Sequence, residues 1–282
     1  MALNSDVALP SLPSNAPCPS NAPCLPPAFT FVIAEDTESV KSAADSDDFR
    51  GSEHEHDSDF DSDPPASPVR SPEVRKPLIV VDFDDTVAPS TLLTRHFDDN
   101  KHCSVEENYA QFQRLHALKL ATLSTNVCTL LTTLKIYGDV CIVTNSCEGW
   151  VKTFCDNCRL TELWDLLQTV EIVSARSRYQ TEQNKDCPED WKKAAFDALL
   201  DDTKHGLLVS LGDNPLDITA AMHVGNSRRI PVKTAHFHVT PTWEQLHAQL
   251  ADLLRWVPHL TTFPVLPLHL KAQHSRFVDT TW

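Results

Sequence analysis

The chain has 282 residues, of which 39 are acidic and 24 are lysine or arginine, giving a formal net charge of −15. This length accommodates one domain of ordinary size together with additional segments. Net acidity without a Lys/Arg-rich run argues against a nucleic-acid-binding surface. The start of the chain lacks the pattern of a signal peptide and no apolar run is long enough to cross a membrane, so we expect a soluble cytoplasmic protein with no membrane partner.

The first 75 residues differ in composition from the remainder of the chain. They contain 14 acidic and four basic residues, a balance of −10, which leaves −5 for all later residues. They also hold 11 of the 20 prolines and few large apolar side chains. Such a segment cannot bury enough apolar surface to offset the entropy lost on ordering. We therefore predict a disordered acidic tail, rich in proline and serine, over residues 1–75 and a folded part that begins near Lys76.

The first predicted strand ends in a cluster of acidic residues. Residues 78–81 are apolar without polar alternation, which predicts a central parallel strand covered on both faces. The strand leads into Asp82-Phe83-Asp84-Asp85-Thr86, in which extended geometry points Asp82 and Asp84 the same way. Like charges so close together require a cation between them or a proton on one of them. A site of this kind can hold a hard cation and leave a carboxylate oxygen free to attack an electrophile.

The next stretch predicts loops, helices and strands in turn. Residues 88–101 read as a loop, and Ser104 and Glu107 have the spacing of a capping box at the start of a helix. The apolar face predicted for that helix consists of Tyr109, Phe112, Leu115 and Leu118. A second helix is predicted from about Thr122 to Ile136, ended by Gly138. The elements predicted beyond it are a strand ending at Thr144, helices over residues 150–158 and 163–167, and a strand over residues 169–173.

The cysteines fit a reducing compartment. There are nine, an odd number, without the spacing of a disulfide framework. Cys155 and Cys158 form a Cys-x-x-Cys pair on a predicted helix, with no second pair at the spacing of a zinc site. Packing is the favoured interpretation of this pair over metal or redox chemistry.

A second acidic strand end follows a lysine-bearing helix. Residues 188–200 predict a helix in which neighbouring side chains point about 100° apart, so only one of Lys192 and Lys193 can face the sheet, and we favour Lys192. Residues 207–211 predict a strand that opens into Gly212-Asp213-Asn214-Pro215-Leu216-Asp217. Pro215 suits the first turn of a helix, which places Asp213 at the strand end and Asp217 within the helix.

The remaining elements complete an α/β pattern. We expect the helix after Asp217 to end at Gly225, a strand over residues 230–239, and an amphipathic helix from Pro241. His236 and His238 share a face of that strand, and an edge or surface position is favoured over metal binding. Residues 257–282 are expected as a C-terminal extension, wrapped along the body or frayed. The alternation predicts a Rossmann-like three-layer fold over residues 76–256, with a mostly parallel sheet whose acidic strand ends meet in one crevice.

Four motifs, in this order, resemble those of the haloacid dehalogenase-like (HAD) superfamily. They are Asp82 to Thr86 after an apolar strand, Thr144-Asn145-Ser146 after another, Lys192 on an amphipathic helix, and Gly212-Asp213 through Asp217. The resemblance covers residues 78–222 and implies a HAD-like catalytic domain. The superfamily often carries a large cap domain between the first motifs, but only 57 residues separate Thr86 from Thr144 here. We therefore expect a fairly open crevice.

The resemblance implies a Mg²⁺-dependent phosphatase that acts through an aspartyl-phosphate. Asp82 would be the nucleophile, and Asp84 would protonate the leaving oxygen and then activate water. The implied Mg²⁺ ligands are Asp82, the backbone carbonyl of Asp84, and Asp213, with Asp217 as a ligand or orienting partner, and the implied phosphate-binding residues are Thr144, Asn145 and Lys192. The substrate would be a phosphorylated small molecule or a phosphoprotein. The alternative is a HAD-like fold that serves as a binding or scaffold protein with little or no catalysis.

Overall fold

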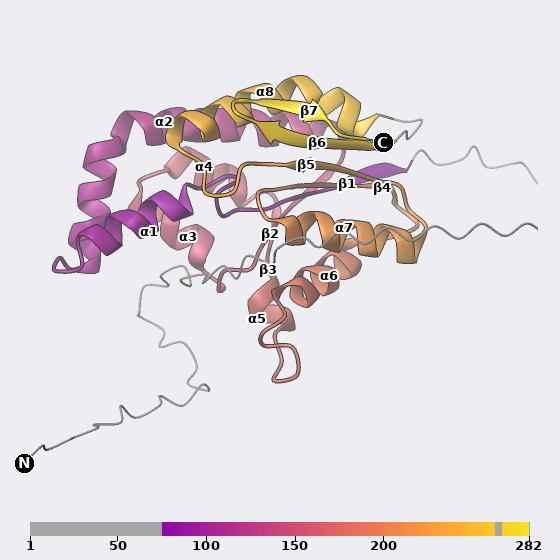
Figure 1. The fold of residues 1–282 in the computed structure, drawn as a ribbon, viewed down its shortest axis with the longest axis horizontal. Helices are drawn as coiled ribbons and strands as arrows, with labels where there is room; N and C mark the ends of the chain where they lie inside the picture. Colours follow the sequence, from indigo (N-terminus) through magenta and orange to yellow (C-terminus); the bar gives the residue numbers. More distant parts are fainter. Residues whose placement is uncertain (1–74, 263–266, 282) are drawn as a thin grey trace, which may run out of the picture. The chain divides into compact units, whose positions relative to one another are not determined.

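The computed structural model describes residues 75–262 and 267–281, and it has the predicted α/β architecture (Figure 1). Its strands are β1 (Lys76–Val81), β2 (Asp139–Thr144), β3 (Glu171–Ser174), β4 (His205–Gly212), β5 (Val232–His236), β6 (Leu268–Gln273) and β7 (Arg276–Asp279). They form one sheet in the order β3-β2-β1-β4-β5-β6-β7, in which only the β6–β7 pair is antiparallel. The predicted disordered tail falls on residues outside the described part of the chain.

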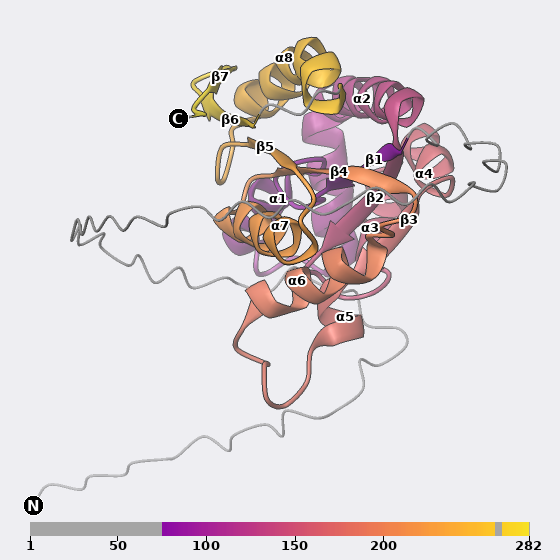
Figure 2. The same ribbon diagram turned by 90° about the vertical axis from the view of Figure 1, so that its right-hand side faces the viewer.

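Helices cover both faces of the sheet, which gives the predicted three layers (Figure 2). The helices are α1 (Ser90–Asp99), α2 (Val105–Tyr137), α3 (Trp150–Asn157), α4 (Thr161–Leu167), α5 (Ala175–Tyr179), α6 (Pro188–Leu199), α7 (Pro215–Arg228) and α8 (Trp243–Thr261). No helix in the described ranges combines the length and apolar composition needed to cross a membrane.

Strand β1 shows why the central strands are apolar on both sides. Ile79 and Val81 pack in the core beneath α2 and α8, whereas Leu78 and Val80 pack in a second core beneath α6 and α7. All four side chains are at most 1% exposed. The strand order reverses between β1 and β4, because the chain first builds outward through β2 and β3 and then returns to the other side of β1. In doubly wound sheets this reversal marks the crevice where ligands bind.

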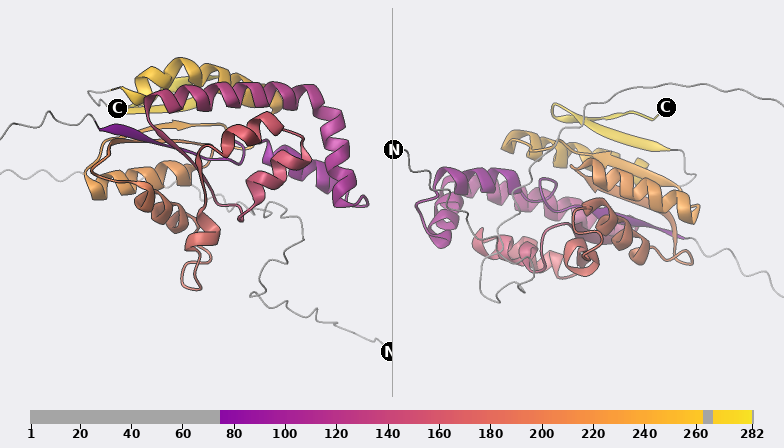
Figure 3. Two further views of the ribbon diagram at one scale, coloured as in Figure 1. Left: turned by 180° about the vertical axis from the view of Figure 1, so that it is seen from behind. Right: turned by 60° about the horizontal axis from the view of Figure 1, so that its bottom comes forward.

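The region after β1 is more helical than the sequence suggested. Residues 88–101, expected as a loop, contain α1, whose Leu93 is buried. The two helices expected beyond Ser104 are both present, because α2 joins two helical segments across a kink at His116, and the bend is visible in the magenta helix of Figure 3. No glycine or proline lies between the two segments, so no strong local signal marks the kink.

The bend in α2 changes which apolar residues are buried. The capping box of Ser104 and Glu107 is present as predicted, and Phe112 is fully buried. Leu115 and Leu118, expected on the same apolar face, are instead 65% and 82% exposed. They flank the non-helical backbone at His116, where the regular helical spacing behind the prediction breaks down.

The C-terminal part is also more ordered than expected. Residues 257–282 were predicted as an extended wrap or frayed end, but α8 continues to Thr261 and the following residues add β6 and β7 to the sheet. Helix α7 also runs three residues beyond Gly225, the expected stop, to Arg228. Gly225 is buried within that helix, and a Cβ at this position would collide with the Val232 side chain of β5. It is a packing residue rather than a helix end.

Lys233 of β5 is a buried cation that caps a helix. Its Nζ donates hydrogen bonds to the backbone carbonyls of His259 (2.6 Å) and Thr262 (3.1 Å) at the end of α8. Burial lowers the pKa of this lysine. The side chain satisfies carbonyls that the helix leaves without partners and places a donor at the negative end of its dipole.

We expect Lys233→Met to lower the free energy of unfolding by about 1–3 kcal/mol, because two carbonyls lose their donor while most of the apolar stem is kept. Thermal and denaturant unfolding measure the change. Lys271→Met is the matched control, since Lys271 lies in the neighbouring strand β6 but is exposed, and it should change stability by less than about 0.5 kcal/mol. Equal losses in the two variants would contradict the capping role.

Candidate functional site

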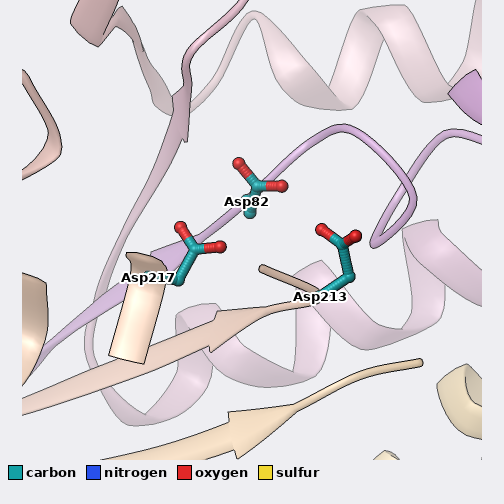
Figure 4. Close-up of side chains that lie close together, drawn as sticks. All are labelled: Asp82, Asp213 and Asp217. Atoms are coloured by element: carbon teal, nitrogen blue, oxygen red, sulfur yellow. The ribbon is translucent and has the colours of Figure 1, made fainter. Parts of the chain in front are cut away.

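Three carboxylates converge where the strand order reverses. Asp82 follows β1, Asp213 follows β4, and Asp217 lies in the first turn of α7 (Figure 4). Each offers a carboxylate oxygen, and these oxygens lie within 4.8 Å of one another. All three residues are buried, with exposures of 8% or less. The structure therefore brings together three of the four predicted metal ligands through their side chains.

The local backbone explains how the three carboxylates meet. Val81 and Leu211 are in register, and the Asp82 N–H donates to the Leu211 carbonyl (2.8 Å), so both strands end at the same level. Asn214 caps α7 through its side chain, and Pro215 occupies the first turn as predicted. A Cβ at Gly212 would meet the Asp217 carboxylate, so this close approach requires glycine.

Lys192 is the single buried cation that contacts these carboxylates in the described part of the chain. Its Nζ donates to Asp82 Oδ1 (2.6 Å) and to Asp217 Oδ1. Burial lowers the pKa of Lys192, but Asp217 and Asp82 outweigh this effect and raise the pKa above its ordinary value. Lys193 points away and pairs with Glu189 (2.7 Å) at the surface. The preference for Lys192 over Lys193 as the inward-facing residue is confirmed.

Burial and mutual repulsion shift the carboxylates toward the protonated form. Burial is the main cause that raises the pKa of Asp82, of Asp213 and of Asp217. Lys192 opposes the shift at each of them, while neighbouring carboxylates add to it at Asp82 and Asp213. The cluster is therefore short of positive charge even with Lys192 in place.

The donor set fits a divalent hard cation. Three ionised carboxylates and one ammonium carry a net charge of −2, and the ligand atoms are all oxygens, as Mg²⁺ prefers. Asp217 Oδ2 is buried without a hydrogen-bond partner. The bridge between Asp84 and Ala88 uses the carbonyls of Phe83 and Ala88, which leaves the Asp84 carbonyl outside its hydrogen bonds. That carbonyl can serve as the expected backbone ligand.

The Asp84 side chain lies outside the three-carboxylate cluster and is held by four donors. Oδ1 accepts from Ser90 Oγ (2.5 Å) and Trp150 Nε1 (2.8 Å), and Oδ2 accepts from Thr144 Oγ1 (2.7 Å) and Ser146 Oγ (2.8 Å). The donors come from α1, from the end of β2 and from α3. They fix the direction of a carboxylate beside the cluster.

The second motif holds the site together through its side chains. The Thr144 hydroxyl donates to Asp84 and accepts from the Ser146 N–H (2.9 Å). Asn145 donates from its amide to the Pro188 carbonyl (3.3 Å) at the start of α6, which carries Lys192. Thr144 therefore contacts a predicted catalytic residue directly, whereas Asn145 ties the β2 end to the lysine helix.

Several residues of the site were missed or misread from the sequence. Ser90 and Trp150 were given no role, because their contacts with Asp84 depend on tertiary packing. His236 was taken as an edge or surface residue, but β5 is paired on both sides and His236 Nε2 donates to the Asp213 carbonyl (2.8 Å). Burial lowers the pKa of His236. Its contact follows from the register of His236 with Gly212, the residue before Asp213, which the sequence alone does not reveal.

The Cys-x-x-Cys pair is part of the core. Cys155 and Cys158 are at most 2% exposed and pack among apolar side chains. Burial raises the pKa of each thiol to about 12, so neither is a thiolate near neutral pH. The packing interpretation is consistent with this arrangement.

Removing one carboxylate from the cluster should change stability with the opposite sign from most core substitutions. The folded-state pKa of Asp213 is raised above its unfolded value, so ionisation at rising pH costs stability in metal-free buffer. We expect Asp213→Asn to raise the metal-free melting temperature at pH 8, by about 2–4 °C for each kcal/mol of repulsion relieved. Below about pH 3, where the carboxyl is protonated in both states, the gain should vanish.

The same variant tests the cation. Mg²⁺ should raise the melting temperature of the unmodified chain more at pH 8 than at pH 5, because it competes with protons for the same oxygens. Asp213→Asn should remove most of that increase. An unchanged Mg²⁺-induced shift in the variant, measured by scanning calorimetry, would place the cation elsewhere.

Comparison with known proteins does not assign the chain to a family. A scan against models of protein families finds no match to the chain, and a search of curated proteins finds no significantly similar sequence. The site is therefore interpreted from its own residues: three buried carboxylates, a buried lysine, and a fourth carboxylate held by hydroxyl and indole donors.

Proposed function

We propose that the chain is a Mg²⁺-dependent phosphatase of the HAD-like type, acting through an aspartyl-phosphate on Asp82. The observation that carries the proposal is the convergence of Asp82, Lys192, Asp213 and Asp217 in one buried cluster at the reversal of the strand order. These residues come from four elements spread over more than a hundred positions. Their order along the chain, and the strand or helix that carries each of them, match the motifs of the resemblance.

Asp82 is suited to be the nucleophile. Lys192 holds its Oδ1, which orients the carboxylate and leaves Oδ2 to attack phosphorus. A bond forms between the Asp82 oxygen and phosphorus while the bond from phosphorus to the ester oxygen breaks. Mg²⁺, held by Asp82, Asp213, Asp217 and the Asp84 carbonyl, would neutralise negative charge on the phosphate.

Asp84 is suited to move the proton. In its protonated form, the Asp84 carboxyl group would give a proton to the departing ester oxygen. The resulting carboxylate, held by its four donors, would then take a proton from the water that attacks the phosphorylated Asp82, which releases phosphate, restores the Asp82 carboxylate and reprotonates Asp84. Ser90, Thr144, Ser146 and Trp150 keep it aimed beside the nucleophile. Lys192 supports the transition state by its positive charge next to Asp82.

The test is an assay of the full chain with an aryl phosphate, with and without Mg²⁺. We expect turnover that requires Mg²⁺ and is inhibited by beryllium fluoride, which mimics a phosphoryl group on a carboxylate. No turnover with aryl phosphates or with a panel of phosphorylated metabolites and peptides would favour the alternative, a HAD-like fold that binds without catalysis.

A further inference from the structure

Among the described residues, no helix covers one face of the β6–β7 strand pair next to the candidate site. The side chains of Leu270 and Phe277 point into the core beneath α8. Side chains alternate along a strand, so Lys271 and Arg276 point to the opposite face, the side on which α7 covers β4 and β5. Figure 2 shows the β6–β7 hairpin beside α8 and away from α7. Lys271 and Arg276 are both exposed.

This open face is continuous with the candidate metal site. Gly212, His236 and Lys271 are in register across β4, β5 and β6, and they therefore form a row on one face. Neighbouring strands lie about 4.8 Å apart, so Lys271 begins about 10 Å from Gly212, the residue before Asp213. His236 joins the two regions because its Nε2 donates to the Asp213 carbonyl (2.8 Å). We call the surface of His236, Lys271 and Arg276 the basic face.

The cations of the basic face have no carboxylate partner among the described residues. Some other basic residues are paired, such as Lys119 with Glu244 and Arg228 with Asp197, whereas Arg176 and Lys185 also lack a carboxylate partner in the described part of the chain. The nearest acidic residue of the hairpin, Asp279, is in register with Leu270 and so points to the α8 face. What distinguishes Lys271 and Arg276 is their place on the strand pair that continues from the candidate site, where two exposed positive charges can attract an anionic ligand.

We propose that the basic face binds acidic residues that follow the phosphorylated side chain in a phosphopeptide substrate. This inference rests on the proposed function, and it names the class of substrate. An extended peptide advances about 3.3 Å per residue, so a carboxylate two to four positions beyond the phosphorylated residue reaches Lys271 and Arg276. A small phosphorylated molecule normally needs a pocket that encloses most of its surface, whereas Lys271 and Arg276 stand on an open strand pair.

The test compares two phosphoserine peptides of equal length, one with acidic residues at the three positions after phosphoserine and one with glutamine there. Binding is measured by fluorescence anisotropy in the presence of Mg²⁺, with Asp82→Asn present in every protein to prevent turnover. The full chain should bind the acidic peptide more tightly. Lys271→Gln/Arg276→Gln should weaken that binding about tenfold, the loss expected for two ion pairs, and should not change binding of the glutamine peptide.

The matched control removes the same charge at the opposite end of the sheet. Arg176→Gln/Lys185→Gln changes two basic residues in and after α5, which follows the edge strand β3. This variant should bind the acidic peptide as the Asp82→Asn protein does. Equal losses in both double variants would mean that only net charge matters, and would overturn the inference.

The remaining outcomes separate this inference from the proposed function. If the unmodified chain hydrolyses aryl phosphate but the two peptides bind equally, or the basic-face variant binds the acidic peptide normally, the inference is wrong and the function stands. If no phosphate ester is hydrolysed, but the basic-face variant binds the acidic peptide more weakly while the control variant does not, the inference stands and the proposed function is wrong. A basic face occupied by a second copy or by the chain's own acidic residues 1–75 would appear as peptide binding insensitive to Lys271 and Arg276.

Discussion

An Asp82→Asn variant should hydrolyse an aryl phosphate about 10⁶-fold more slowly than the unmodified chain, in line with losses seen when a nucleophile is removed. The amide has nearly the same shape as the carboxylate but cannot attack phosphorus. Lys192 keeps its contact with Asp217, so the geometry around the substituted residue should persist. The measurement is kcat with Mg²⁺ in excess, together with thermal unfolding to show that the variant is folded.

Asp85→Asn is the matched control for Asp82→Asn. Asp85 is also buried, but its carboxylate accepts from the Thr91 N–H (2.9 Å) and hydroxyl at the start of α1 rather than from Lys192. Asparagine tolerates the left-handed backbone at this position (φ 52°). Activity should fall far less than in Asp82→Asn. If Asp82→Asn retains the activity of the unmodified chain, Asp82 is not the nucleophile.

Lys192→Met should lower both activity and stability. Loss of a cation that stabilises transition-state charge typically costs 10²–10³-fold in kcat, and we expect about that decrease. Removing one partner of a buried ion pair typically costs about 3–5 kcal/mol, because the remaining charges stay buried. Here Asp82 and Asp217 lose their ammonium partner and Asp213 loses a nearby positive charge, so the loss should grow as pH rises and the carboxyls ionise. Mg²⁺ should restore more stability to this variant than to the unmodified chain.

Lys193→Met provides the control on the neighbouring position. Lys193 lies at the surface, and the Glu189 and Asp190 carboxylates raise its pKa without any contact with the cluster. Exposed ion pairs contribute little to stability because solvent screens them, so stability and kcat should change little. A larger loss of kcat in Lys193→Met than in Lys192→Met would be incompatible with the inward position of Lys192.

The centre of the fold and the core of the site were predictable from the sequence. Largely apolar runs mark β1 and β4, and they lead into Asp82 directly and into Asp213 after Gly212. Parallel strands place such ends at one edge of the sheet, so Asp82 and Asp213 had to approach one another if the strands were neighbours. Pro215 fixed the start of α7 and with it the position of Asp217. These signals are all local.

The surroundings of the site depend on contacts that no local pattern encodes. Ser90 was missed because α1 begins without a side-chain cap, so its start resembles a loop. Trp150 was placed correctly at the start of α3, but its hydrogen bond to Asp84 joins residues 66 positions apart. In contrast, β6 does carry a readable pattern, because Leu268, Leu270 and Ala272 alternate with more exposed residues. That period of two could have identified the strand.

The pairing of β1 with β4 has a consequence for the time the chain takes to assemble. Lys76 pairs with His205, so this contact closes a long loop, whereas α2 and the other helices need only nearby residues. Contacts of long sequence separation slow folding and tend to form late. We therefore expect the buried carboxylates to come together after the folding transition state, so that a cation bound to them would mainly slow unfolding. Mg²⁺ should lengthen the lifetime of the folded chain by slowing unfolding, while the refolding rate stays nearly the same.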